Sequence, residues 1–146
     1  MAEQTEGEID IDASPEEVLE VITDFESYPS WAQGIKKAEI KKTDSQGRPS
    51  EVYMEVGQMG FNASYTLTYK YKAKDGGLSW TSKDTSGAIK SLKGEYDLED
   101  TGEGTHVTYR MTAEPGVKVP GMIRKQVEKT IIGTALGGLK KRVEGR

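Results

Sequence analysis

The sequence predicts an α+β domain, in which a curved antiparallel sheet of seven strands wraps around a long C-terminal helix, with two short helices between the first two strands. A capped helix follows an alternating N-terminal segment, alternation then continues through residues 35–111, and a helical repeat fills residues 121–143. Alternation of apolar and polar residues is typical of half-buried strands, whereas apolar spacings of three and four residues are typical of amphipathic helices. Because so twisted a sheet cannot lie flat on one helix, we expect it to curl and leave room for a cavity.

A strand and a capped helix open the chain. Residues 7–13, GEIDIDA, alternate and predict the first strand. The next segment, SPEEVLEVITDF, has Ser14 as N-cap, Pro15 at the first helical position and Glu17 three residues after the cap. This combination starts helices, because the serine and glutamate side chains each satisfy a free backbone N–H group. One stripe of the helix should be buried, and it contains Val18, Val21, Ile22 and Phe25.

A bend separates this helix from the next strand. Pro29 disfavours helical geometry at Tyr28, so we expect the chain to turn before Trp31 through a second short helix or turn. Trp31 is one of only two tryptophans in the chain. Its indole either closes one end of an apolar pocket or plugs the core beneath the bend, and both alternatives place it against the same apolar interior.

Residues 35–111 predict an antiparallel meander of six strands, separated by glycine-containing turns such as KDGG and EDTGEG. The clearest strand, FNASYTLTYKY at residues 61–71, has one apolar and one polar face. The same alternation places acidic residues and the single histidine on the face away from the apolar side, namely Glu55, Glu95, Asp97 and His106. A cavity on the apolar side would therefore contain tyrosines and almost no carboxylates.

Residues 121–143 predict the long helix, about 34 Å at about 1.5 Å per residue. Glycine costs about 1 kcal/mol relative to alanine in a helix, so Gly133, Gly137 and Gly138 should permit a close approach of the sheet or leave ligand space. The alternative is fraying near the C-terminal end. The helix is also basic, which favours a solvated face over contact with a membrane or partner, through Arg124, Lys125, Lys129, Lys140, Lys141 and Arg142.

Composition excludes several classes of function. The net charge of −4 disfavours nucleic acid as a partner, because phosphate neutralisation requires a basic surface. The chain has no cysteine and one histidine, which excludes disulfides and thiol catalysis and leaves few ligands for zinc, copper or iron. No acidic loop of the calcium-binding type occurs. We therefore expect no metal and no cofactor.

Length and segment pattern predict one domain, residues 1–146. The chain shows neither the pattern of a signal peptide nor a run of about 18 apolar residues, so we expect no integral membrane segment and a cytoplasmic location. We expect a monomer.

Two stretches resemble a known group of proteins. In IDASPEEVLEVITDFESYPSWAQGIKKAEI, residues 11–40, the capped helix runs into an Asp-x-x-x-Tyr-Pro-x-Trp corner, and EPGVKVPG, residues 114–121, leads into the final helix. This pattern resembles the START-like (SRPBCC) superfamily of helix-grip folds, and within it the bacterial polyketide cyclase/dehydrase and lipid-transport family. The resemblance covers essentially the whole chain. It implies a sheet gripping the last helix around a pocket for lipids, polyketides, quinones or other hydrophobic molecules.

Alternation and helical spacing identify candidates for the wall of this pocket, which could equally make a solid core. Five methionines and seven tyrosines, mostly at inward positions, favour a pocket, because they offer adaptable contacts and apolar rings with a polar tip. The candidates are Trp31, Met54, Val56, Met59, Phe61, Tyr65, Leu67, Tyr69, Trp80, Leu92, Tyr96, Tyr109 and Met111 from the sheet side, and Ile123, Val127 and Ile131 from the helix.

The favoured function is binding or transport of a hydrophobic small molecule, such as a lipid, polyketide or quinone, in this internal cavity. The alternative is a polyketide cyclase, aromatase or dehydratase that uses tyrosine hydroxyls to orient a substrate. No nucleophile with an adjacent base is visible, so no catalytic residue is assigned and a non-catalytic protein is favoured. Residues 113–121, with the turn at Met59 and Gly60, form either a hinged entrance or a plain connection.

Overall fold

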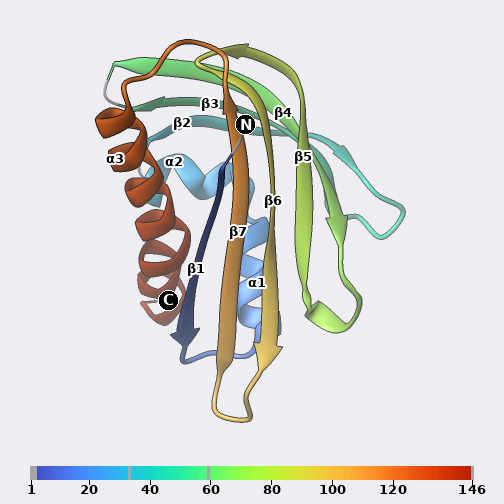
Figure 1. The fold of residues 1–146 in the computed structure, drawn as a ribbon. Coiled ribbons are helices and arrows are strands. Elements are labelled where there is room, and N and C mark those ends of the chain that lie inside the picture. Colours follow the sequence, from blue (N-terminus) through green and yellow to red (C-terminus); the bar gives the residue numbers. More distant parts are fainter. Residues whose placement is uncertain (1–2, 33, 59, 146) are drawn as a thin grey trace.

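The computed structural model describes residues 3–32, 34–58 and 60–145. A single curved sheet faces a long C-terminal helix, with short helices between β1 and β2 (Figure 1), which confirms the predicted fold class. In chain order the elements are β1 (Glu3–Ile11), α1 (Pro15–Thr23), η1 (Phe25–Ser27), α2 (Tyr28–Trp31), β2 (Ile35–Thr43), β3 (Pro49–Gln58), β4 (Phe61–Tyr71), η2 (Ala73–Asp75), β5 (Gly77–Gly87), β6 (Ile89–Asp100), β7 (Thr105–Pro115), α3 (Gly121–Ile132), η3 (Gly133–Gly138) and α4 (Leu139–Glu144).

The sheet has seven strands in the order β1-β7-β6-β5-β4-β3-β2, and every neighbouring pair is antiparallel. Its register brings inward side chains of adjacent strands together, with Met54 opposite Tyr65 and Tyr96 opposite Tyr109. β4 alternates between buried and less buried residues along its length. The predicted division into an inward apolar face and an outward polar face is therefore confirmed.

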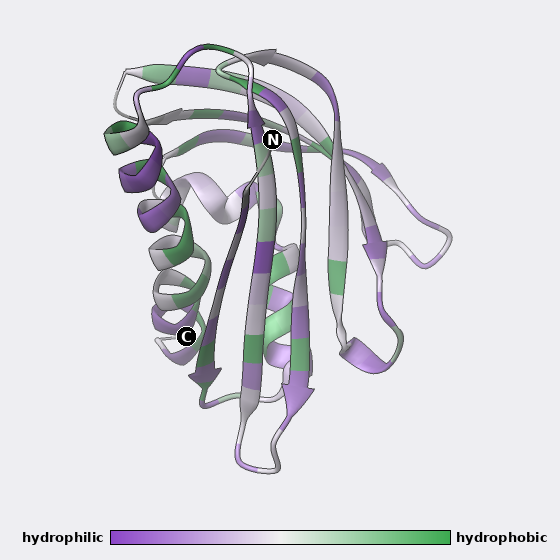
Figure 2. Ribbon diagram, viewed as in Figure 1, coloured by the Kyte–Doolittle hydropathy of each residue, from purple (hydrophilic) through white to green (hydrophobic). Residues whose placement is uncertain are grey.

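The long helix consists of three consecutive pieces. α3 and α4 are α-helical, whereas η3 between them is a π-helix of six residues. A π-helix pairs each N–H with the carbonyl five residues earlier, so it is wider than an α-helix, and such segments occur frequently at functional sites. Figure 2 shows hydrophobic residues on the side of the helix that faces the sheet and hydrophilic residues on its outer side.

The helix glycines do not permit the close approach that the sequence suggested. A Cβ atom at Gly133 or Gly137 would meet nothing within 4 Å, and one at Gly138 would make ordinary contacts at 3.8 Å. The tight position is instead Gly7 on β1, where a Cβ atom would lie 2.7 Å from the Leu136 Cδ1 atom. A glycine on the strand, and not the glycines of the helix, lets the two elements pack closely here.

One half of the concave side of the sheet is solid. α1 packs against β6 and α4, and its Ser14 N-cap accepts the predicted bond from the Glu17 N–H group. Almost completely buried side chains from helices and strands fill this half, namely Ile11, Val18, Ile22, Phe25, Leu78, Thr105, Val107 and Leu139.

The other half has no such filling. α1 has nine residues and is about 13 Å long, whereas the 11 residues of β4 extend about 36 Å. α1 therefore covers less than half of the strand length. Beyond it the sheet faces α2 and α3, neither of which contains a buried residue. The concave side is left hollow between these two helices and the sheet.

Two glycine substitutions should change stability in opposite directions. A Cβ atom at Gly94 would lie 2.5 Å from the Arg110 carbonyl oxygen and 2.7 Å from Cζ2 of Trp80. We expect Gly94→Ala to lower the free energy of unfolding by about 1–3 kcal/mol through overpacking, and Gly133→Ala to raise it by up to about 1 kcal/mol. Urea unfolding measures both. A Gly94→Ala protein as stable as the wild type would contradict this account of the close packing.

Candidate functional site

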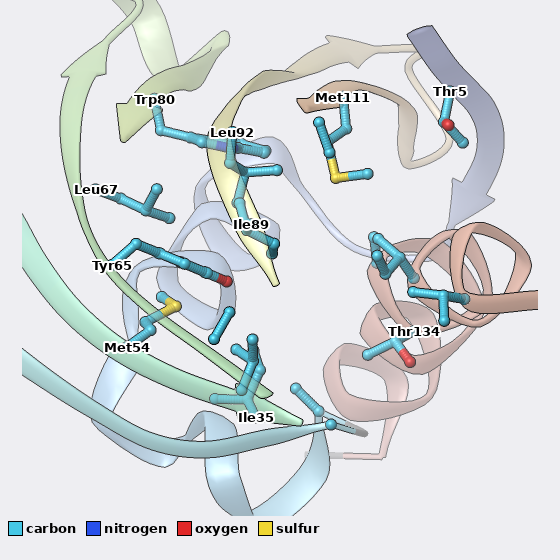
Figure 3. A pocket seen from close by; sticks show the side chains of 18 of the residues that line it. Thr5, Ile35, Met54, Tyr65, Leu67, Trp80, Ile89, Leu92, Met111 and Thr134 are labelled. Atoms are coloured by element: carbon cyan, nitrogen blue, oxygen red, sulfur yellow. The ribbon is translucent and has the colours of Figure 1, made fainter. Parts of the chain in front are cut away.

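A cavity of about 270 Å³ occupies the hollow half of the protein. Its wall takes side chains from all seven strands, from α1, η1 and α2, and from α3 and η3. In Figure 3, Tyr65, Leu67 and Trp80 line it from the sheet, while Thr134 projects from the helix on the opposite side. Of the described lining residues only Glu114 and Pro115 are exposed, so the cavity opens beside the end of β7. We call this opening, bordered by Glu114, Pro115, Val119 and Arg124, the mouth.

The structure brings most of the sequence candidates to one wall. Ile123 is half-buried on α3, one turn before Val127 and toward the exposed start of the helix, and does not line the cavity. Met59 lies outside the described residues. On the wall are Trp31, Met54, Val56, Phe61, Tyr65, Leu67, Tyr69, Trp80, Leu92, Tyr96, Tyr109, Met111, Val127 and Ile131.

Several lining residues were not among the candidates. Ala63 and Leu78 share the inward parity of their strands, so alternation alone could have identified them. Thr5 was missed because the first strand was expected to begin at residue 7, whereas it begins at Glu3. The solid core also borders the cavity, through Ile22 and Phe25. No sequence signal distinguished this contact from ordinary packing.

The expectation of a cavity almost without carboxylates is wrong at its border. The lining includes Glu114 at the mouth and Glu128 on α3, together with Arg124. Thr5 Oγ1 donates to Glu128 Oε2 at 3.0 Å, and Arg124 Nε lies 3.9 Å from Glu128 Oε1. The helix candidates Ile123, Val127 and Ile131 covered too narrow a face, because the face of a helix that packs on a core spans at least about 100°. Charged groups therefore reach the edge of the cavity from α3 and β7.

Aromatic rings form a continuous row along the inner side of the cavity. The Phe25 and Tyr69 ring centres lie 4.6 Å apart, and Trp80 lies 6.1 Å from Tyr69 and 5.7 Å from Tyr109. Such tilted pairs add about 0.5–1.5 kcal/mol each beyond burial. The row therefore holds the rings in fixed positions. From α2 to β7 it contains Trp31, Tyr28, Phe25, Tyr69, Trp80, Tyr96 and Tyr109.

Trp31 combines the two roles that the sequence left open. It lines the cavity, and its Cζ3 atom lies 3.8 Å from the Cβ position of Gly138 in η3. It therefore connects the bend after α1 with the C-terminal helix. Its Nε1 atom is buried without a hydrogen-bond partner among the described residues.

The tyrosine hydroxyls divide into two groups. Those of Tyr28, Tyr53, Tyr71 and Tyr96 each donate to an acceptor within the chain, which for Tyr96 is the Ala135 carbonyl at 2.8 Å.

The second group comprises Tyr65, Tyr69 and Tyr109, whose hydroxyls have no hydrogen-bond partner among the described residues. All three residues line the cavity and are 6–7% exposed. Burial raises the pKa of each hydroxyl above its usual value, so all three stay protonated at neutral pH. Trp31 Nε1 is the only unpaired side-chain polar atom of the described residues that is completely buried, so these three hydroxyls are open to the cavity, where a ligand can pair with them.

Comparison with known proteins shows the family to which the chain belongs. Residues 2–144 match the model of the family described as polyketide cyclase / dehydrase and lipid transport. The chain belongs to this family. No curated protein matches the chain.

Solved structures similar to this family member share its fold. A START superfamily protein from Mycobacterium smegmatis has a TM-score of 0.83 at 24% identity, with 97% of both chains covered. The Zhui aromatase/cyclase from Streptomyces sp. R1128 has a TM-score of 0.78 at 14% identity, covering 99% of this chain and 94% of that chain. A STAR-related lipid transfer protein from Xanthomonas axonopodis has a TM-score of 0.71 at 22% identity, covering 95% of this chain and 84% of that chain.

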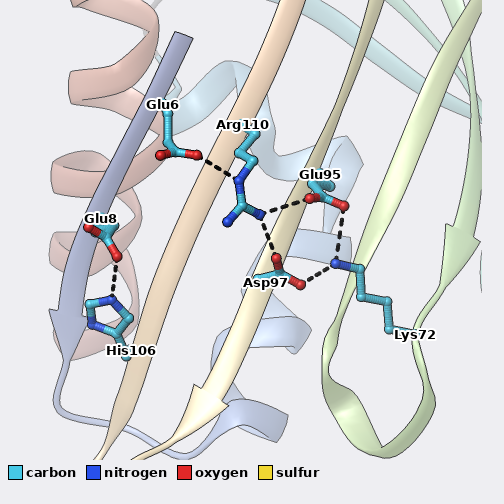
Figure 4. A network of polar contacts seen from close by, with 7 residues as sticks. All are labelled: Glu6, Glu8, Lys72, Glu95, Asp97, His106 and Arg110. Atoms are coloured by element: carbon cyan, nitrogen blue, oxygen red, sulfur yellow. Dashed lines mark hydrogen bonds and ion pairs between the residues drawn. The ribbon is translucent and has the colours of Figure 1, made fainter. Parts of the chain in front are cut away.

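The outer face of the sheet of this family member carries a network of ion pairs, shown in Figure 4. Arg110 contacts Glu6 at 2.6 Å, Glu95 at 2.8 Å and Asp97 at 2.6 Å, and Lys72 pairs with both of the last two carboxylates. The opposite charges of these residues pair with one another on the side of the sheet away from the cavity. The predicted outward position of Glu95 and Asp97 is confirmed, and we assign the network a structural role.

His106 lies on the same outer face, as its strand parity predicted. Its Nε2 atom lies 3.0 Å from Glu8 Oε1, and its Nδ1 atom lies 2.7 Å from Asp10 Oδ1. The hydrogen bond to Glu8, followed by that to Asp10, raises the pKa of His106 above its usual value.

The pH dependence of stability should report this site. Because the folded-state pKa of His106 is raised, its contribution is fully present below about pH 6.5 and is lost as the pH rises through the folded-state value. NMR titration of the wild-type protein should show a pKa of His106 above about 6.5. In a Glu8→Gln, Asp10→Asn double variant the pKa of His106 should return to about 6.5. If the pKa of His106 is the same in that variant as in the wild type, the two carboxylates are not the cause of the raised pKa.

Proposed function

We propose that this protein binds and carries a compact, predominantly apolar small molecule in the cavity between the sheet and α3. The observation that carries the proposal is the cavity of about 270 Å³ with a wall mainly of aliphatic and aromatic side chains. Family membership supports it, because the family description includes lipid transport. Ligand pockets generally combine an apolar wall with a few polar groups, as this wall does. The wall residues predicted from the sequence are the proposed ligand contacts.

The size of the cavity limits the ligand. Pockets for drug-sized ligands typically measure about 300–1,000 Å³, so this one lies just below the usual range. A ligand with long acyl chains would have to extend through the mouth. The volume therefore favours a compact ring system or a short branched molecule.

Burial alone supplies useful affinity for such a ligand. About 300 Å² of apolar ligand surface at about 25 cal/mol per Å² contributes about 7 kcal/mol before the costs of association. Before those costs, 7 kcal/mol corresponds to a Kd of about 10 μM, so burial alone gives binding in the micromolar range or weaker. A carrier needs a ligand that also leaves, and this range suits both loading and release.

The interior favours carriage over catalysis. General acid–base catalysis needs a titratable group whose pKa lies near the working pH. Away from the border, the titratable groups of the described wall are tyrosines, and burial moves the pKa of Tyr65, Tyr69 and Tyr109 further from neutrality. A cyclase or aromatase would have to rely on orienting its substrate. We keep it as the alternative function, since the family description includes polyketide cyclase.

Filling the cavity should abolish ligand binding. Thr134 points into the cavity from η3 (Figure 3), so Thr134→Trp places an indole in the ligand volume. We expect the affinity for the apolar fluorescent probe phenylnaphthylamine to fall at least tenfold, equivalent to about 1.4 kcal/mol. Lys129→Trp is the matched control, because Lys129 is exposed on the same helix. Fluorescence titration measures both, and equal affinities in the two variants would refute the proposed cavity function.

We further propose that ligand exchange occurs during transient contact with a membrane surface. The exposed large hydrophobic residues of the described chain are Val117 and Met122, 45% and 85% exposed, and each lies two residues in sequence from a residue that borders the mouth. The exposed Lys118 directly follows Val117, and the exposed Lys125 lies three residues after Met122, which suits an anionic lipid surface. None of the helices in the described ranges has the length and hydropathy needed to cross a bilayer.

Acidic substitutions should abolish this contact. We expect a Val117→Asp, Met122→Asp double variant to lose co-sedimentation with vesicles containing phosphatidylglycerol, because both apolar contact and charge attraction weaken. Ser45→Asp with Gln46→Asp is the charge-matched control, in the exposed turn between β2 and β3. If the Val117→Asp, Met122→Asp variant still sediments with the vesicles as the wild type does, ligand exchange does not occur through this membrane contact.

A further inference from the structure

We propose that Tyr65, Tyr69 and Tyr109 form a hydroxyl cluster that selects ligands carrying a neutral carbonyl oxygen on a compact apolar body. The inference rests on the proposed function, that the cavity binds a small apolar molecule, and adds the chemical class of that molecule. It separates ketones, quinones and esters from plain hydrocarbons and from free carboxylic acids.

The contrast among the tyrosines carries the inference. The chain has seven tyrosines, and four of them donate to the acceptors of Ile22, Glu55, Pro49 and Ala135. The three without a partner among the described residues all line the cavity. If the chain simply tolerated unpaired hydroxyls, tyrosines without a partner would be expected away from the cavity as well as on its wall. Their position indicates that the missing partner belongs to the ligand.

Two of the three rings are also held in place by other aromatic rings. Tyr69 packs against Phe25 at 4.6 Å, and Tyr109 packs against Tyr96 at 4.9 Å between ring centres. In Figure 3 the hydroxyl of Tyr65 points toward the middle of the cavity. Rings fixed in this way lose little freedom when a ligand binds, so the hydrogen bonds they form contribute more of their energy to affinity.

The charge of the ligand follows from the surroundings of the cluster. A protonated tyrosine hydroxyl donates one hydrogen bond, and an oxygen acceptor on the ligand satisfies it. The charged residues of the described wall, Glu114, Arg124 and Glu128, come from the end of β7 and from α3, whereas the cluster lies on β4 and in the middle of β7. A carboxylate placed among these hydroxyls would be desolvated without a cation beside it, which is unfavourable. A neutral carbonyl avoids this cost.

A matched pair of probes tests the selection. Fluorene and fluorenone have the same fused rings and differ in one position, where fluorenone carries a carbonyl in place of a methylene group. We expect the wild-type protein to bind fluorenone about fivefold more tightly by calorimetry, equivalent to about 1 kcal/mol for one hydrogen bond. In the Tyr65→Phe, Tyr69→Phe, Tyr109→Phe triple variant this ratio should fall to about one, with the affinity for fluorene unchanged.

Tyr53→Phe is the control variant, because Tyr53 does not line the cavity and its hydroxyl already donates to Glu55. It should keep the fivefold ratio and lower the melting temperature, whereas the three single variants of the cluster should leave the melting temperature unchanged or raise it. The infrared carbonyl band of fluorenone bound to the wild-type protein should shift to lower frequency, a readout that does not depend on any variant.

The outcomes separate the two proposals. If neither probe binds, the proposed cavity function fails and the inference fails with it. If both bind with equal affinity, if the triple variant keeps the ratio, or if the carbonyl band of bound fluorenone does not shift, the cavity function stands and the hydroxyl cluster is refuted.

Discussion

Strands of about 11 residues curve over a nine-residue helix, and this difference in length determines where the protein is solid. α1 and α4 cover one half of the concave face with buried side chains such as Val18 and Leu139. Beyond the end of α1, the sheet faces α2 and α3, which bury no residue. Close packing of the whole concave side would need a longer α1 or larger side chains on α3, and the chain has neither. The cavity, its mouth and the unpaired hydroxyls all follow from this constraint.

Stability and binding oppose each other in the hollow half. An apolar core packed to normal density would remove the voids and would not bury hydroxyls without partners. The chain instead leaves the hydroxyls of Tyr65, Tyr69 and Tyr109 open to the cavity, and it buries Trp31 Nε1 without an acceptor among the described residues. Departures from good packing and polar pairing are expected at functional sites, where the stability lost is offset elsewhere. Here the offset comes from the dense half around α1.

Local patterns predicted most of the fold and much of the wall. Parity along β7 separated Tyr109, which lies inside, from His106, which lies outside, because neighbouring residues of a strand face opposite sides. The capping box identified the start of α1 for an equally local reason. The pairing of Thr5 with Glu128 spans 123 residues, and no local pattern contains it. The rotation of α3 and the π-helical segment depend on such long-range contacts, so the charged border of the cavity could not be predicted.

The π-helical segment marks the boundary between a firmly held and a loosely held part of the C-terminal helix. The Tyr96 hydroxyl donates to the Ala135 carbonyl within η3, and α4 beyond it buries Leu139 and Val143. α3 before it buries no residue, although Val127 and Ile131 line the cavity. Its side chains are tied to β1 by the bond between Thr5 and Glu128. Because opening a segment with few buried contacts costs little free energy, a ligand that passes beside α3 disturbs less of the structure than one that passes beside α4.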